Sequence, residues 1–387
     1  MTLTPSEQLS CEFISCLHIQ DPSYSLKIIG AFAWYIPQRF GSSAALDDVA
    51  TCMLASHAAI VRGSSPSLRI NPLLYARALR TVQQAIDDQS EWKSSNTLCA
   101  VLLLHRIEAV FGESFGLSEV VHASGVAALL EKRGPPNPTD TFDSFVTADS
   151  HACIIHQALV QGKDCFIASQ KWAAAVDALN GCSHLQTIFY QILRQMTVWP
   201  NLVREKLHFY KGDPRVDPVT IVQKAYQVKG AMLEIGLKLD ALIEEYDLAR
   251  PVPPTCLFSL VPEMLEFKDP MAALILCYHA TFSIIISQIL SSLVNNTISE
   301  SELEGEILHQ SKRIWMLVEH GRQNKPLGLP ILQTALILTT EWANREAQKE
   351  IIAIMNELDS SMKSSREGWT REKLIYKAMV FRGDLAA

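Results

Sequence analysis

The sequence lacks the cysteine spacing of a zinc-binding or disulfide-rich protein. Its nine cysteines are dispersed along the 387 residues, and no pair shows the short spacing that zinc ribbons and zinc fingers require. An odd, dispersed set of thiols in mostly apolar stretches is typical of reduced cysteines in the core of an intracellular protein. We therefore expect an intracellular protein with no metal site and no cofactor.

A surplus of basic charge is also absent. The chain has 34 lysine and arginine residues against 41 aspartate and glutamate residues, so its formal net charge is −7. An acidic surface repels phosphate groups on average. The composition therefore argues against direct nucleic-acid binding by this chain.

Standard enzyme motifs are missing as well. The sequence has no Gly-rich phosphate loop, no Gly-x-Ser-x-Gly elbow and no His-Glu-x-x-His metal helix. The stretch from His151 to His156 includes Cys153 and contains metal-ligand residue types, but on a helix His151 lies roughly 200° from Cys153 and roughly 140° from His156. One ion cannot easily reach all three side chains, so we predict ordinary core or surface histidines there.

Targeting segments are not evident either. Residues 1–12 lack a basic start followed by a long apolar core, which argues against a secretory signal. Residues 271–294 contain no charged side chain and approach the length that spans a bilayer, but they include a histidine, a glutamine and several serines. Their flanks carry no aromatic belt or basic cluster. We predict a buried central helix and no membrane contact.

What the sequence does contain is a succession of helical patterns. Apolar residues recur at three- and four-residue spacing in nearly every segment, and strand-like alternation is almost absent. We predict an all-α fold, an irregular α-α array or superhelix of roughly fifteen helices, since no regular sequence period indicates a known repeat. One of the predicted helices starts at Asp21-Pro22. Another runs from Asp140 to Gln161.

One domain, residues 1–387, is the predicted organisation. Pro251-Val252-Pro253-Pro254 is the strongest rigid break in the chain, and a subdivision near residues 248–256 is the alternative. Because apolar helices on both sides of this break need packing partners, we interpret it as a turn within a single array.

The most informative stretch runs from Asn96 to Pro138. Its first predicted helix places Leu98, Val101, Leu102, His105 and Glu108 on one face, and Gly112 supplies a stop. Ser118 can cap a second helix, whose small residues Ala123, Gly125, Ala127 and Ala128 would let a neighbouring helix approach closely. Arg133-Gly134-Pro135-Pro136 ends it, so the stretch predicts a helical hairpin.

This hairpin carries the pattern His122-x-x-Gly125-x-x-x-Leu129-Leu130-x-x-Arg133-Gly134, preceded by a helix that contains Glu108. The arrangement resembles the central signature of the fungal-specific transcription factor domain, the all-helical regulatory region downstream of the zinc cluster in many fungal regulators. The resemblance extends over roughly residues 20–385. It implies that Glu108, His122, Gly125, Arg133 and Gly134 form the structural signature of a regulatory domain.

The DNA-binding module of that family is not found. The family usually carries closely spaced cysteines with adjacent lysines and arginines, whereas residues 1–60 contain only Cys11, Cys16 and Cys52, with Lys27 and Arg39 as the only basic side chains. We therefore expect this chain to act without a zinc cluster of its own.

Glu108 allows two interpretations, because burying a carboxylate in an apolar helix is costly unless something pairs with it. One is a structural clasp with His122 or an arginine, for which Arg133 is the candidate. The other is general acid–base catalysis by Glu108 with His105 or His122, since burial can raise the pKa of a carboxyl group and a histidine can transfer protons near neutral pH. We favour the clasp, because the position resembles the family's own structural motif.

Three functions remain open. The first is a transcription-factor-like regulator of a filamentous fungus, linked to a secondary-metabolite gene cluster, located in the nucleus or cytoplasm and acting through a partner regulator, a homo-oligomer or a bound small hydrophobic metabolite. The second is a biosynthetic enzyme with cyclase-, isomerase- or dehydratase-like acid–base chemistry at Glu108, His105 and His122. The third is a scaffold whose concave helical surface binds a partner protein.

Overall fold

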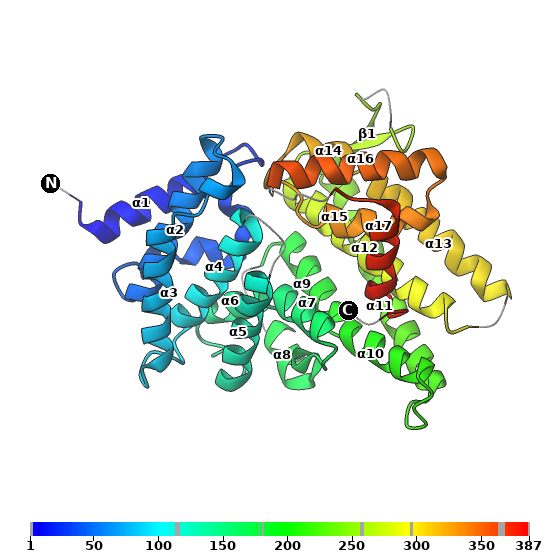
Figure 1. The fold of residues 1–387 in the computed structure, drawn as a ribbon, viewed down its shortest axis with the longest axis horizontal. Helices are drawn as coiled ribbons and strands as arrows, with labels where there is room; N and C mark the ends of the chain where they lie inside the picture. Colours follow the sequence, from blue (N-terminus) through cyan, green and yellow to red (C-terminus); the bar gives the residue numbers. More distant parts are fainter. Residues whose placement is uncertain are drawn as a thin grey trace.

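The computed structural model of the protein describes residues 3–112, 117–177, 179, 182–255, 259–294, 297–362 and 368–385. Within these residues the chain forms seventeen α-helices, six short 3-10 helices and one two-stranded sheet. The all-α prediction is therefore confirmed. Figure 1 shows α1 to α6 on one side of the molecule and α10 to α17 on the other, with α7 to α9 between them.

The first half of the chain supplies ten α-helices within the described residues: α1 (Pro5–Leu17), α2 (Ala44–Val61), α3 (Pro72–Asp87), α4 (Ser95–Phe111), α5 (Leu117–Arg133), α6 (Thr141–Asp149), α7 (His151–Gln161), α8 (Gln170–Asp177), α9 (His184–Met196) and α10 (Trp199–Tyr210). Five 3-10 helices connect them: η1 (Leu26–Ile29), η2 (Ala31–Tyr35), η3 (Pro37–Arg39), η4 (Pro66–Leu68) and η5 (Phe166–Ala168).

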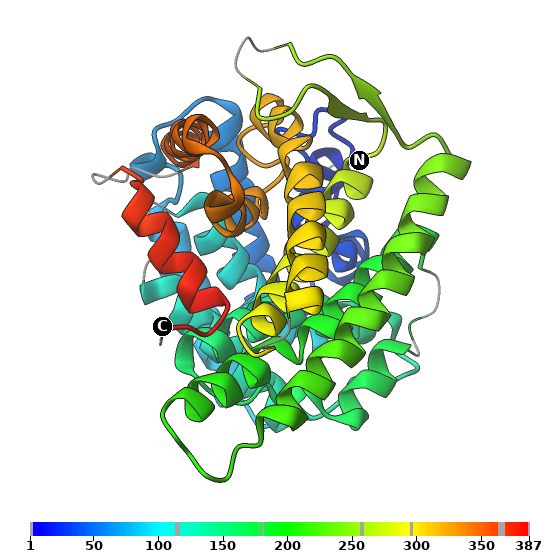
Figure 2. The ribbon, with the colours of Figure 1, turned by 90° about the vertical axis from the view of Figure 1, so that its right-hand side faces the viewer.

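The second half contains the remaining described elements: α11 (Pro218–Glu245), β1 (Ala249–Val252), β2 (Met264–Phe267), α12 (Pro270–Ser291), α13 (Thr297–Trp315), α14 (Val318–Gln323), α15 (Leu332–Thr339), η6 (Thr340–Trp342), α16 (Arg345–Met362) and α17 (Arg371–Phe381). In Figure 2 the β-hairpin lies at one end of the molecule, and α11 and α17 flank α13.

Three of the long helices begin with the same local device. Asn71-Pro72 starts α3, Asp217-Pro218 starts α11 and Asp269-Pro270 starts α12. In each case the side-chain oxygen of the capping residue accepts a hydrogen bond from a backbone N–H of the first turn, and proline occupies a position where no N–H is needed. These boundaries are therefore encoded locally in the sequence.

Helix α12 forms the centre of the second half. It packs against α9, α11, α13 and α15, and two of its polar side chains bond to neighbouring helices: His279 Nε2 lies 2.8 Å from the carbonyl oxygen of Met232, and the Gln288 amide donates to the carbonyl of Leu338 over 3.2 Å. Helices α2 and α12 are long and apolar enough to cross a membrane, and 61% and 89% of their apolar windows are buried inside the protein. Burial against other helices explains this composition without a bilayer.

The prediction of an α-helix that starts at Asp21-Pro22 is wrong, because the structure has 3-10 helices in this segment. Residues 26–39 form the three short 3-10 helices η1, η2 and η3. Gly30 has φ of +135°, a backbone conformation that interrupts any α-helix, and a side chain there would meet the Asp149 carboxylate. The backbone N–H of Phe32 donates to that carboxylate over 3.1 Å, so a distant residue determines the local structure.

Two further predictions need correction. The helix expected from Asp140 to Gln161 is divided at Ser150 into α6 and α7, where Arg106 donates to the carbonyl oxygen of Asp149 over 3.0 Å. The break at residues 251–254 includes part of an antiparallel hairpin, in which β1 pairs with β2 and Val252 lies opposite Met264. The prediction of one domain stays a prediction.

Candidate functional site

Glu108 and His122 meet at the hydroxyl group of Tyr75. The Tyr75 hydroxyl lies 2.7 Å from His122 Nε2 and also hydrogen-bonds to the Glu108 carboxylate. Because a carboxylate only accepts, Tyr75 donates to Glu108 and its oxygen accepts from His122 Nε2–H. The three side chains come from α3, α4 and α5, so this Tyr75 cluster joins three helices.

The electrostatics of the cluster follow from partial burial. Burial raises the pKa of Tyr75, and its hydrogen bond to Glu108 raises it further, so the phenol stays protonated at neutral pH. Burial lowers the pKa of His122, while the Glu108 charge acts in the opposite direction. A protonated phenol between an imidazole and a carboxylate is a stable hydrogen-bonded chain. Its role, structural or catalytic, stays a prediction.

Arg133 does not pair with Glu108, which corrects the arginine form of the clasp. Its guanidinium donates to the Asp143 carboxylate over 2.9 Å, and both side chains are 7% exposed. Arg133 Nε also donates to the carbonyl of Lys93 over 2.8 Å. Since α4 and α5 are antiparallel, Arg133 lies beside the start of α4, whereas Glu108 lies near its end.

The other predicted positions are distributed along the hairpin. His105 is buried within α4 with 4% of its surface exposed. On α5, Ala123 and Ala127 face the core, whereas Gly125 and Ala128 are exposed, and a side-chain carbon at Gly125 would lie 3.9 Å from Val101 of α4. Gly134 ends α5 with φ of +86°, and its N–H donates to the carbonyl of Leu130.

Asp149 is a buried carboxyl group that ties the N-terminal segment to the middle of the chain, and it was not among the residues predicted from the sequence. Its two oxygens accept hydrogen bonds from Phe32 N–H and the Tyr190 hydroxyl, each over 3.1 Å. Burial raises its pKa to about 6, although these hydrogen bonds and the Arg106 charge lower it. No local pattern marks Asp149, because its partners are 117 and 41 residues away along the chain.

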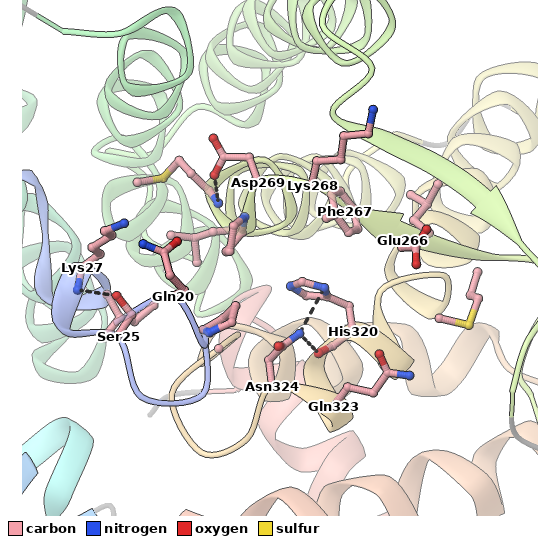
Figure 3. A pocket seen from close by; sticks show the side chains of 18 of the residues that line it. Gln20, Ser25, Lys27, Glu266, Phe267, Lys268, Asp269, His320, Gln323 and Asn324 are labelled. Atoms are coloured by element: carbon pink, nitrogen blue, oxygen red, sulfur yellow. Dashed lines mark hydrogen bonds between the residues drawn. The ribbon is translucent and has the colours of Figure 1, made fainter. Parts of the chain in front are cut away.

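A cavity of about 720 Å³ lies between the N-terminal segment, the β-hairpin with the start of α12, and α14 (Figure 3). Figure 3 shows Gln20, Ser25 and Lys27 on one wall and His320, Gln323 and Asn324 on another. Apolar residues form a large part of the lining, among them Ile19, Pro22, Ile28, Val252, Met264, Leu265, Phe267, Met271 and Leu274. This volume lies in the range of drug-sized ligand sites, and the mixture of lining residues is typical of them.

None of Glu108, His105 and His122 lines this cavity, and none lines the smaller one, about 270 Å³, between α12, η6 and Arg382. The structure therefore separates the predicted acid–base residues from the two cavities. Residues 113–116 lie outside the described residues.

His151, Cys153 and His156 do not assemble a site. His151 is 2% exposed, and burial lowers its pKa to about 4, while the Cys153 thiol donates to the carbonyl of Ser150 over 3.1 Å. Over the ranges that the structure describes, no group of three or more histidine, cysteine, aspartate or glutamate side chains has the geometry to hold a metal ion.

Comparisons with known proteins give no family for this chain. The search of protein-family models found no match, and neither the curated proteins nor the solved structures gave one. The function must therefore be inferred from the geometry described above and from the resemblance in the hairpin.

Proposed function

We propose that the chain is a ligand-sensing regulatory domain, resembling that of fungal transcription factors, which controls a secondary-metabolite gene cluster of a filamentous fungus through a partner regulator. The observation that carries this proposal is the 720 Å³ cavity. A ligand-sensing regulator needs a site for its input, and the cavity offers such a site.

The position of the cavity suits such a role. Its walls come from residues 19–28, from residues 252–255 and 264–274, and from residues 320–328, which are far apart along the chain. A bound molecule that contacts all three segments stabilises the conformation in which they lie together. Ligand binding then shifts the population of that conformation and the surface it presents to a partner.

The link to transcription rests on the hairpin resemblance. The Tyr75 cluster and the Arg133–Asp143 pair hold α4 and α5 to their neighbours, which agrees with a structural signature at these positions. The formal charge of −7 favours action through another DNA-binding protein. In this proposal the protein works in the nucleus, with a small hydrophobic metabolite as its ligand.

A gene-replacement experiment in the producing fungus tests this function. Deleting the gene is expected to change the transcript levels of neighbouring biosynthetic genes, and the wild-type gene is expected to restore them. Leu274→Trp, which fills the cavity from α12, is expected to fold but not to restore them. Leu308→Trp is the matched control, because Leu308 lies on the exposed face of α13. Unchanged transcripts after deletion, or full restoration by Leu274→Trp, would refute the proposal.

An acid–base enzyme is the second candidate, because Glu108 and His122 share the Tyr75 hydroxyl. A cyclase, isomerase or dehydratase needs such groups at its substrate. Glu108→Gln tests this candidate. The variant must fold and keep its thermal stability but lose the conversion of a metabolite that the wild-type protein performs in fungal extracts. If the wild-type protein changes no compound in those extracts, this candidate is wrong.

A further inference from the structure

His320 presents an unusual hydrogen-bond donor at the cavity. It lies on α14, its side chain lines the 720 Å³ cavity, and only 7% of its surface is exposed. Its Nε2 is shielded and has no hydrogen-bond partner among the residues that the structure describes. Buried polar atoms of proteins are nearly always paired, so an unpaired one at a cavity points to a ligand group.

The neighbouring Asn324 determines which nitrogen carries the proton. The side-chain nitrogen of Asn324 donates to the carbonyl oxygen of His320 over 2.8 Å, which identifies it as the amide NH2. The same nitrogen lies 3.3 Å from His320 Nδ1, so Nδ1 accepts its second hydrogen. Burial lowers the pKa of His320 to about 4, which keeps the ring neutral. Nε2 therefore carries the hydrogen and can only donate.

The surroundings of His320 favour an uncharged molecule with apolar surface. The ring of Phe267 packs edge-on against the imidazole, with ring centroids 5.2 Å apart. The charged lining residues are two cations, Lys27 and Lys268, and two anions, Glu266 and Asp269. Lys268 pairs with Asp247 and Glu266 pairs with Arg250, while Asp269 caps α12, so three of these four charges already have partners.

We propose that the cavity binds an uncharged, mainly apolar molecule that carries a carbonyl oxygen, and that this oxygen accepts a hydrogen bond from His320 Nε2–H. The proposal rests on the ligand-sensing function above and names the chemical class of the ligand. In Figure 3 the imidazole extends from α14 towards the wall that carries Gln20. The hydrogen bond would thus connect α14 with a molecule that also contacts the N-terminal segment.

Binding of a matched pair of probes tests the proposal. Fluorenone and fluorene have the same flat ring system, and only fluorenone carries a carbonyl group. Titration calorimetry on the full chain is expected to show about tenfold tighter binding of fluorenone, which is the effect of one hydrogen bond of about 1.4 kcal/mol. In His320→Phe the two affinities are expected to become equal.

Two further variants control for disruption of the cavity. His320→Gln keeps an N–H donor at this position and is expected to restore part of the preference for fluorenone. His309→Phe places the same side chain on the exposed surface of α13 and is expected to leave the preference unchanged. Loss of the preference in His320→Phe together with its partial return in His320→Gln assigns the effect to the donor.

The outcomes separate this proposal from the proposed function. Equal affinity of the wild-type protein for both probes, or a preference that survives in His320→Phe, overturns the role of His320 but leaves a ligand-binding regulator in place. A His320-dependent preference, combined with unchanged transcripts in the gene-deletion strain, supports the ligand class and overturns the regulatory function. No binding of either probe overturns the ligand class proposed here, whereas the regulatory function stands or falls with the gene-deletion experiment.

Discussion

The Arg133–Asp143 ion pair should be one of the strongest single links of the fold. The Asp143 side chain is 7% exposed, and replacing Arg133 by leucine leaves its carboxylate with a hydrogen bond from the Asn137 backbone N–H over 3.0 Å but without its positively charged partner. An uncompensated buried charge of this kind costs about 3–5 kcal/mol. The lost hydrogen bond from Arg133 to Lys93 adds about 1 kcal/mol. We expect Arg133→Leu to be destabilised by about 4 kcal/mol or more.

A double-mutant cycle isolates the pair from these other effects. Asp143→Leu leaves the Arg133 guanidinium buried without its carboxylate partner. The double variant contains neither charge, so it should be destabilised by much less than the sum of the destabilisations of the two single variants. We expect a coupling free energy of about 2–3 kcal/mol. The exposed pair Arg250–Glu266, with side chains 64% and 54% exposed, is the matched control and should show a coupling below about 1 kcal/mol.

The cycle also tests whether Arg133 pairs with Glu108. Arg133 bonds to Lys93, and Glu108 lies fifteen residues further along the chain. Because an α-helix rises about 1.5 Å per residue, Glu108 lies roughly 22 Å from Arg133. Arg133→Leu and Glu108→Gln should therefore be additive to within about 0.5 kcal/mol. The assay is urea unfolding followed by tryptophan fluorescence and far-ultraviolet circular dichroism, with coincident transitions as the condition for a two-state treatment. Coupling between Glu108 and Arg133, or none between Arg133 and Asp143, refutes the assignment.

Three other predictions follow from the described contacts. Burial raises the pKa of Asp149 from 3.8 to about 6 in the folded protein. Between these pH values the folded state binds more protons than the unfolded state, so the free energy of unfolding should fall by roughly 3 kcal/mol from about pH 4 to pH 7. Asp149→Asn should remove this part of the pH dependence in urea titrations; an unchanged slope contradicts the burial argument. Tyr75→Phe removes the hydroxyl that joins Glu108 and His122 and should lower stability by about 1–2 kcal/mol, whereas Tyr376→Phe on the exposed face of α17 should have little effect. At Gly134 no atom lies within 4 Å of an added side chain, so Gly134→Ala should cost about 1 kcal/mol of stability through the backbone φ of +86° alone. Gly230 also has open space around it but lies inside α11, so Gly230→Ala should be stabilising. Equal effects of the two substitutions on thermal unfolding contradict this reasoning.

Much of the helical framework could be predicted from the sequence because its signals are local. Asn71-Pro72 marks the start of α3, and the charge-free stretch from residue 271 becomes the buried helix α12. The prediction failed where distant residues decide the local structure. Leu26, Ile29 and Phe32 have helical spacing, yet Gly30 and the hydrogen bond from Phe32 to Asp149 impose 3-10 geometry on this segment. Helical periodicity reports only which side chains face the core, and 3-10 turns satisfy that requirement as well as an α-helix does.

The candidate site shows the same limit more clearly. Glu108 and His122 stood out because a carboxylate in an apolar helix is conspicuous, but Tyr75, which connects them, is an ordinary residue of an amphipathic helix. Nothing in the sequence around His320 distinguishes it, since its significance depends on a cavity whose walls are separated by up to about three hundred residues of chain.

The cavity and the buried carboxyl group are connected through the N-terminal segment. Asp149 accepts a hydrogen bond from Phe32 at the start of η2, and η1, which precedes η2 and packs against it, carries the cavity residues Lys27 and Ile28. Gly30 lies between them with the Asp149 carboxylate so close that no side chain fits. The position of one cavity wall is therefore set by a hydrogen bond from the middle of the chain. A ligand that draws this wall towards His320 acts on the same segment that Asp149 holds, so the two interactions should be energetically coupled, and Asp149→Asn should alter ligand affinity without touching the ligand.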